Sequence, residues 1–119
     1  PSSFSGSKGQ QLANYACQFI GNPYVPGGTS LTDGADCSGF VWRVYKDFGY
    51  TVPRTSYSVR SYGSEVSYSE AQPGDVVCYA GHVALYIGNG QIVHASTKRT
   101  GIKITNATYK EILTIRRVV

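Results

Sequence analysis

The chain has 119 residues, enough for one domain with a sizeable core and too few for two. Only 15% of the residues are charged, against roughly 25% in an average soluble domain, whereas 41% are hydrophobic and ten are Tyr. This balance excludes a disordered chain, and no apolar run approaches the roughly 18 residues that a membrane-spanning helix needs. No internal period repeats along the chain, which excludes a solenoid.

The formal net charge is +4, from eleven Lys and Arg against seven Asp and Glu. The basic residues are spread along the chain, and their only adjacent pairs are Lys98-Arg99 and Arg116-Arg117. No basic stripe interleaves with stacking aromatic residues, so we expect no nucleic-acid partner. A mildly basic surface would also suit a polyanionic environment.

The start of the chain predicts a linker followed by a helix. Residues 1–7 are rich in Ser and Gly and carry no targeting signal, which indicates a linker remnant of a longer protein. Residues 8–20 carry apolar side chains at helical spacing, and Gly21 and Pro23 favour the end of that helix. We therefore expect one domain over residues 8–119.

The rest of the chain predicts a second helix and then a series of strands. Residues 37–48 form the helix, with Asp36 as its N-cap. The Ser- and Tyr-rich residues 51–72 have weak periodicity and allow at most a short helix. After a turn come five strand-like segments, residues 75–79, 82–87, 91–96, 102–105 and 113–118. Two helices followed by a strand meander predict an α+β fold.

Three cysteines cannot form a complete disulfide framework, so at least one thiol is free. Cys17 lies beside the apolar stripe of the first helix and Cys78 lies in a strand, which favours a place in the core for both. Cys37 stands where a loop enters the second helix, and the backbone N–H groups there favour a thiolate and a lowered pKa. The carboxylate of Asp36 opposes that effect, so a histidine partner, ideally an imidazolium, is expected.

The two histidines, His82 and His94, flank the hairpin signal Gly88-Asn89-Gly90. A two-residue type I′ turn would place them on opposite faces of the sheet. A three-residue loop would pair Ala84 with His94 and bring both imidazoles to one face. Cooperation between the two histidines therefore requires the odd-numbered loop.

Cys37, His82 and His94 together have the residue types of a nucleophile, a base and a group that orients the base. The same three side chains could ligate zinc, but no Cys-x-x-Cys or His-x-x-x-His spacing supports a metal site. Covalent catalysis by the thiol is the favoured interpretation, with no metal or other cofactor.

Six ordered segments resemble the NlpC-type cell-wall cysteine peptidases. The nucleophile motif is similar to Gly34-Ala35-Asp36-Cys37-Ser38-Gly39-Phe40, and the histidine motif to residues 81–88. The other matching segments are residues 22–28, with Asn-Pro-Tyr and Gly-Gly, and residues 53–56, 73–77 and 92–95. The resemblance covers residues 9–118, nearly the whole chain.

The resemblance implies a papain-like fold, with N-terminal helices packed against an antiparallel sheet of about five to six strands. It implies hydrolysis of peptidoglycan stem peptides through a thioester, usually between D-γ-glutamate and the L-diamino acid. It also implies a secreted, wall-located monomer, fused to wall-binding domains in the full-length protein. An amidase on the same fold, or a catalytically silent wall-binding module, are the alternatives.

The resemblance also implies a role for each matched residue. Cys37 is the nucleophile, His82 the general base and His94 the residue that orients it. Tyr24, with the backbone at Cys37, would assist the oxyanion. The residues matching the substrate groove are Asp36, Ser38, Arg54 and Ser56. Two departures are Ser58-Val59, where relatives often carry Gln, and Cys78, where they carry an aromatic or aliphatic residue.

Overall fold

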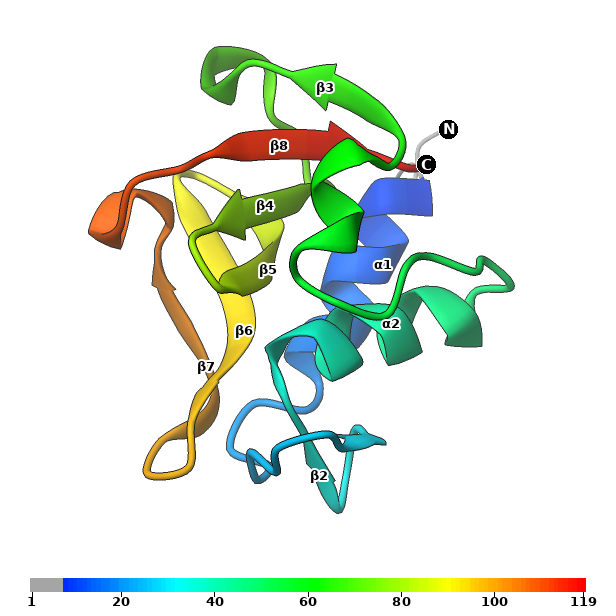
Figure 1. Ribbon diagram of the computed structural model, residues 1–119, viewed down its shortest axis with the longest axis vertical. Helices are drawn as coiled ribbons and strands as arrows, with labels where there is room; N and C mark the ends of the chain where they lie inside the picture. Colours follow the sequence, from blue (N-terminus) through cyan, green and yellow to red (C-terminus); the bar gives the residue numbers. More distant parts are fainter. Residues whose placement is uncertain (1–7) are drawn as a thin grey trace.

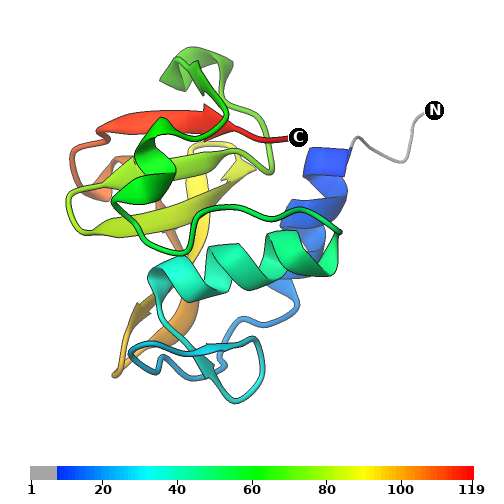
Figure 2. The same ribbon diagram turned by 45° about the vertical axis from the view of Figure 1, so that its right-hand side comes forward.

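A computed structural model describes residues 8–119, so the linker predicted for residues 1–7 lies outside the described part of the chain. Within that part, the helices α1 (Lys8–Cys17) and α2 (Cys37–Asp47) pack together against a six-stranded antiparallel sheet (Figures 1 and 2). The predicted α+β fold, with N-terminal helices on an antiparallel sheet, is confirmed.

The strands of the sheet follow the order β3-β8-β4-β5-β6-β7. Their bounds are β3 (Ser64–Val66), β4 (Val76–Tyr79), β5 (His82–Gly88), β6 (Gln91–Thr97), β7 (Gly101–Asn106) and β8 (Thr114–Arg117). All five predicted strands are present, and β3 is an addition from the segment whose periodicity is weak. That segment also holds two 3-10 helices, η1 (Ser58–Ser61) and η2 (Tyr68–Glu70), and a third, η3 (Ala107–Tyr109), follows β7.

The first helix is shorter than predicted. We expected a helix over residues 8–20, but α1 ends at Cys17 because the chain tightens into a turn. The amide of Gln18 bonds the carbonyl of Tyr15 at 3.1 Å, a three-residue step in place of the four-residue step of an α-helix. The second helix agrees with its predicted span, and Asp36 is its N-cap, with Oδ1 accepting the Gly39 amide at 2.7 Å.

The β5–β6 hairpin corrects one prediction. Gly88 pairs with Gln91, so the loop has two residues, Asn89 and Gly90, with φ of 55° and 73° as a type I′ turn requires. A bulge between Tyr86 and Gly88 then shifts the register by one residue. The requirement for an odd-numbered loop was therefore wrong, because the bulge after a two-residue turn produces the same register, in which His82 and His94 share one face.

The core lies on both faces of the sheet. One cluster fills the space between helices and sheet, with Leu12, Phe40 and Val44 against Leu85 and Val93. The other covers the opposite face and is centred on these residues: Val77, Tyr79, Ala84, Tyr86, Ile92, Ala107 and Ile115. Because both faces of the sheet are packed with apolar side chains, the strands are held rigidly, and this fixes the positions of the histidines on β5 and β6.

The two other cysteines differ in burial. Cys78 is fully buried in the first cluster, so its predicted place in the core is confirmed. Cys17 is only half-buried at the edge of that cluster, because α1 ends there. All three cysteines are free thiols.

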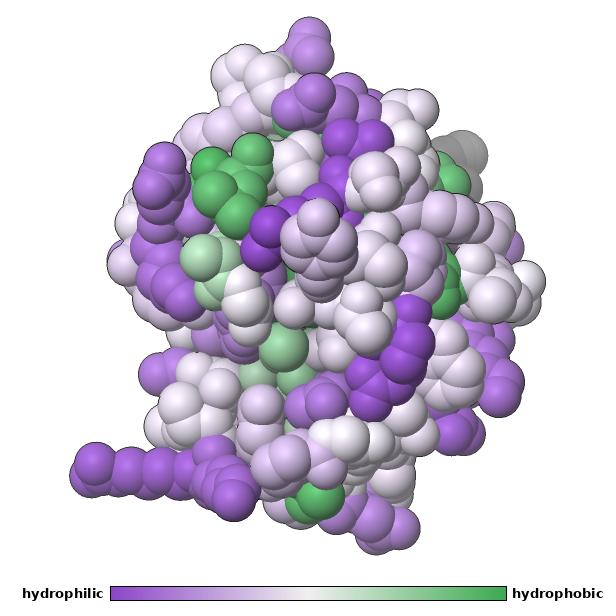
Figure 3. Space-filling model, in the orientation of Figure 1, coloured by the Kyte–Doolittle hydropathy of each residue, from purple (hydrophilic) through white to green (hydrophobic). Residues whose placement is uncertain are grey.

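The surface of the described residues is polar over most of the face in Figure 3, where hydrophobic side chains form small separate spots. No helix within residues 8–119 has the length and apolar character to cross a membrane.

Candidate active site

Cys37 is the first residue of α2, at the end of the helix that faces β6 and β7 in both views (Figures 1 and 2). The backbone N–H groups of Ser38, of Cys37 itself and of Val83 on β5 lie close enough to its sulfur to lower the pKa of the thiol. Val83 directly follows His82 in the chain. The helix start therefore sets the thiol against the strand that carries the first histidine.

The pKa of Cys37 is raised above its ordinary value, which contradicts the lowered pKa expected from the helix terminus. Burial of the sulfur is the largest cause, and the nearby carboxylate of Asp36 adds to it. The amide of Val83 and those of the helix start lower the pKa but do not outweigh burial. In the substrate-free protein Cys37 is a neutral thiol.

The two histidines form a hydrogen-bonded pair. His82 Nε2 lies 2.7 Å from His94 Nδ1, and His94 Nε2 lies 2.8 Å from Thr105 Oγ1 on β7. The pairing between β5 and β6 runs from the turn to Leu85 and Val93 and ends before either histidine. The two imidazoles lie where the strands part, and His94 has no exposed surface.

Both imidazoles are held neutral. Burial lowers the pKa of His82 to about 4, and the positive charge of Lys110 contributes. Burial lowers the pKa of His94 to about 3, with contributions from His82 and from Lys103, its partner across the β6–β7 ladder. The expected imidazolium is therefore absent from the substrate-free site at neutral pH, which carries a neutral thiol near Val83 and, from the residue before Val83, a row of two neutral imidazoles.

Tyr24 lies close to Cys37, since its backbone forms an isolated bridge with Ala35, two residues before the cysteine. Its side chain is half-buried, and burial, Cys37 and Asp36 all raise the pKa of its hydroxyl. The hydroxyl is therefore neutral at physiological pH and is available as a hydrogen-bond donor.

Asp36 organises the loop that precedes α2. Its Oδ2 accepts the Gly27 amide at 2.9 Å, and its Oδ1 lies 3.3 Å from Arg54 Nη1. Arg54 also donates to Ser38 Oγ at 2.7 Å. The structure thus brings three of the four predicted groove residues into one network. Ser56 is half-buried two residues beyond Arg54, and no hydrogen bond within residues 8–119 joins it to these three.

Two residues beside the histidines were not predicted. Thr105 bonds His94, and alternation along β7 could have found it, since Thr105 shares a face with Lys103. Tyr109 lies after β7 in a segment without a motif, with its ring 5.7 Å from that of His94 and 5.4 Å from that of Tyr79. Partial burial is the largest cause that raises the pKa of Tyr109, and the proximity of Cys37 adds to it, so this tyrosine faces the same site.

Within residues 8–119 no group of three or more His, Cys, Asp or Glu side chains could hold a metal ion. His82 and His94 have four ring nitrogens between them. Three of these nitrogens take part in the hydrogen bonds between the two rings and to Thr105.

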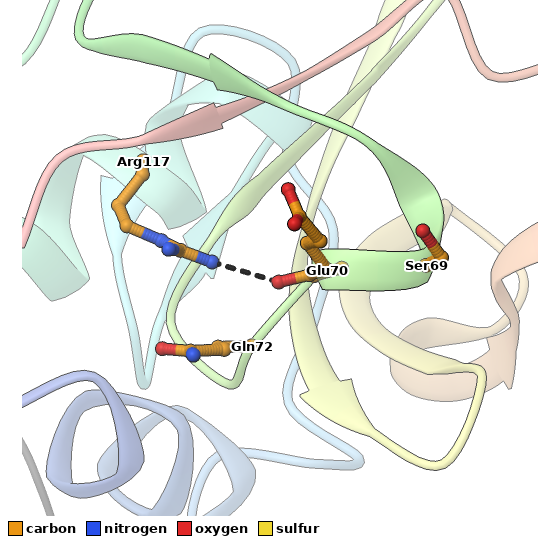
Figure 4. A pocket seen from close by; sticks show the side chains of 5 residues that line it. Ser69, Glu70, Gln72 and Arg117 are labelled. Atoms are coloured by element: carbon orange, nitrogen blue, oxygen red, sulfur yellow. Dashed lines mark hydrogen bonds between the residues drawn. The ribbon is translucent and has the colours of Figure 1, made fainter.

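A separate hollow of about 410 Å³ is lined by Ser69, Glu70, Ala71, Gln72 and Arg117 (Figure 4). The Arg117 guanidinium donates to the Glu70 carbonyl at 2.9 Å and forms an ion pair with the buried Asp75. Its charge is therefore already neutralised within the fold.

Comparison with known proteins relates this fold to bacterial wall enzymes. The chain is 45% identical over 85 residues to murein DD-endopeptidase MepS/murein LD-carboxypeptidase of Escherichia coli K12, covering 66% of this chain and 45% of that protein. It is 37% identical over 101 residues to γ-D-glutamyl-L-lysine dipeptidyl-peptidase of Bacillus cereus, covering 78% of this chain and 30% of that protein. The chain thus spans about half or less of the length of these curated relatives.

The fold and the family agree. The structure of NlpC2 from Trichomonas vaginalis superposes with a TM-score of 0.89 at 25% identity, covering 98% of this chain and 49% of that one. A model of the NlpC/P60 family matches residues 21–117. That span runs from the turn after α1 to the end of β8 and contains every residue of the site, and the chain belongs to the NlpC/P60 family.

Proposed function

We propose that this chain is the catalytic domain of a secreted peptidoglycan hydrolase, a cysteine endopeptidase that cleaves the D-γ-glutamyl–L-diamino acid bond of stem peptides. The observation that carries the proposal is the hydrogen-bonded His82–His94 pair beside a thiol at a helix start. Its support from relatives is the family match and the Bacillus cereus enzyme, whose name specifies a γ-D-glutamyl bond.

The proposed reaction begins with proton transfer from Cys37 to His82. Since His82 Nε2 is bonded to His94, Nδ1 is the nitrogen left to accept the thiol proton. The sulfur attacks the carbonyl carbon of the γ-glutamyl amide, and a C–S bond forms as the C=O π electrons move to oxygen. Backbone N–H groups at the start of α2 and the neutral Tyr24 hydroxyl stabilise the oxyanion.

Collapse of the tetrahedral intermediate breaks the C–N bond. The His82 imidazolium returns its proton to the nitrogen of the leaving diamino acid, which departs as a free amine. Water then attacks the thioester with His82 as the base, and the acid product and the Cys37 thiol are released. Each half of the cycle begins and ends with His82 neutral, in agreement with the lowered pKa of this imidazole.

Asp36, Ser38, Arg54 and Ser56 line the substrate groove in this proposal. The carboxylate of Asp36 could form an ion pair with a free amine of the stem peptide. The same carboxylate already forms an ion pair with Arg54. The network between Asp36, Arg54 and Ser38 holds the groove at a fixed distance from Cys37, because the same carboxylate caps the helix that carries the thiol.

Digestion of purified peptidoglycan, followed by mass spectrometry of the fragments, tests the proposal. We expect fragments ending in D-γ-glutamate, and no release from the Cys37→Ala or His82→Ala variant. Cys17→Ala is the matched control, because it removes a thiol at the edge of the core and should retain activity. Full activity in either site variant would refute the assignment of the nucleophile or the base.

The fragment masses also separate the alternatives. Cleavage between two D-centres would favour the bond named for the Escherichia coli relative. Release of the whole stem peptide from the sugar would indicate an amidase. Wall binding without any fragments would indicate a silent module. We further propose that the domain acts as a monomer fused to wall-binding domains, at the cell wall.

A further inference from the structure

We infer that Thr105 is a positioning residue, which holds His94 in the tautomer that leaves His82 free to act as the base. The inference rests on the proposed function, since it concerns the same proton transfer. It starts from the continuous row of hydrogen bonds that joins His82 to His94 at 2.7 Å and His94 to Thr105 Oγ1 at 2.8 Å.

Two arrangements of protons fit these distances. In the first, His82 Nε2–H donates to His94 Nδ1, and His94 Nε2–H donates to Thr105 Oγ1. His82 Nδ1 then carries a free lone pair and can take the thiol proton. In the second, every bond is reversed, His82 carries its proton on Nδ1, and it cannot act as a base towards Cys37.

The catalytic cycle requires the first arrangement throughout. Once His82 has taken the thiol proton, both its nitrogens carry hydrogen, and Nε2–H needs an acceptor at His94 Nδ1. His94 is fully buried and remains neutral, so its single proton must lie on Nε2. The group within reach to accept that N–H is the Thr105 hydroxyl.

Thr105 is well placed for this task. It faces the same side of the sheet as His94, because Ile92 pairs with Thr105 and His94 pairs with Lys103. It is half-buried, so its own hydroxyl hydrogen can be donated to water while its oxygen accepts from His94. A buried N–H group without an acceptor costs free energy. The Thr105 hydroxyl therefore favours the tautomer in which His94 carries its proton on Nε2.

Replacing Thr105 by Val removes the acceptor while it retains the shape of the side chain. We expect kcat to fall about 10- to 100-fold, the factor for leaving one buried N–H unpaired in the transition state, with KM unchanged because Thr105 is a neighbour of His94 and not of the groove. Thr105→Ser restores the hydroxyl and should restore kcat. Thr108→Val makes the same change at an exposed position of η3 and is the matched control.

The tautomer itself is read from the ¹⁵N chemical shifts of the imidazole nitrogens, without substrate. In the wild type we expect Nε2–H on both rings, and in Thr105→Val a shift of His94 towards Nδ1–H, reversed by Thr105→Ser. Full activity of Thr105→Val overturns the inference. So does an unchanged His94 spectrum, even if kcat falls, because lost packing alone would produce that result.

Failure of the proposed function is a separate outcome. If Cys37→Ala or His82→Ala retains activity, the proposed function fails whatever the spectra show. If both variants are inactive while Thr105→Val is indistinguishable from the wild type, only the inference about Thr105 fails.

Discussion

Gly39 lies in the first turn of α2. For the Gly39→Ala substitution, the structure and helix propensity predict opposite effects on the free energy of unfolding. Gly costs about 1 kcal/mol relative to Ala inside a helix, so propensity alone predicts that Gly39→Ala stabilises the protein. A Cβ at this position would lie 2.0 Å from the Gly28 carbonyl oxygen and 2.7 Å from Asp36 Oδ1. The loop before α2 and the start of the helix would have to separate.

The expected cost follows from the contacts that this separation breaks. Overpacking a close contact costs about 1–3 kcal/mol, and loss of the Asp36 cap about 1 kcal/mol, against about 1 kcal/mol gained from propensity. We expect Gly39→Ala to lower the free energy of unfolding by about 1–3 kcal/mol and the Tm by about 5–15 °C. We also expect kcat/KM to fall, because Cys37 lies in the same turn.

Thermal and urea unfolding followed by circular dichroism measure the loss, with Gly49→Ala as the control at the other end of α2. Gly49 has φ of +89° and no atom within 4 Å of an added Cβ, so the variant pays only for backbone strain, about 1 kcal/mol. A Gly39→Ala protein as stable as the wild type, or more stable than Gly49→Ala, would refute the reasoning.

Two further predictions concern pH. The raised pKa of Cys37 leaves the thiol protonated at neutral pH, so its alkylation by iodoacetamide, followed by peptide mass spectrometry, should accelerate about tenfold per pH unit from neutral into alkaline pH. A plateau below neutral pH would instead reveal a preformed ion pair with His82. The pKa of His82 is about 4 when folded and 6.5 at its ordinary value, so the unfolded chain binds more protons below about pH 6.5. This difference should lower the free energy of unfolding by about 2–3 kcal/mol from about pH 7 to about pH 4.5, and His94, whose pKa is about 3 when folded, should add a fall of similar size. A His82→Gln variant should therefore lose about half of the total dependence, and an equally steep fall in that variant would contradict the assignment.

Local chemistry was enough to predict the elements that begin or end on strong signals. Asp36 caps α2 as the sequence indicated, and the Asn89-Gly90 turn and the strands around it lie where their pattern placed them. The bulge between Tyr86 and Gly88 was not predictable, because an extra unpaired residue leaves no period in a strand of seven residues. Register therefore had to be argued from what cooperation between the histidines requires.

The protonation states were beyond the sequence for a different reason. The amides at the helix start lower the pKa of Cys37, as predicted, but burial raises it more. Cys37 packs against a core cluster whose members come from both helices and the sheet, so its burial depends on the whole fold. The contacts of Arg54 with Asp36 and of Thr105 with His94 also join residues from different parts of the chain, so the sequence did not predict them. Sequence motifs name the candidate residues of the site. The packing of the whole fold sets the dielectric around these residues, and so their pKa values.

A neutral thiol beside neutral imidazoles changes what the remainder of the site has to supply. In the proposed reaction, proton transfer from Cys37 to His82 creates two charges in a buried place, so we expect it to proceed only together with attack on the carbonyl, when the negative charge moves on to the oxyanion. The imidazolium formed at the same time is stabilised by the hydrogen bond to His94. The catalytic power of such a site lies in groups fixed before the substrate arrives, the amides at the α2 start on one side and the row from His82 to Thr105 on the other. Substitutions that loosen either side should therefore reduce kcat more than they raise KM, even where they leave Cys37 and His82 in place.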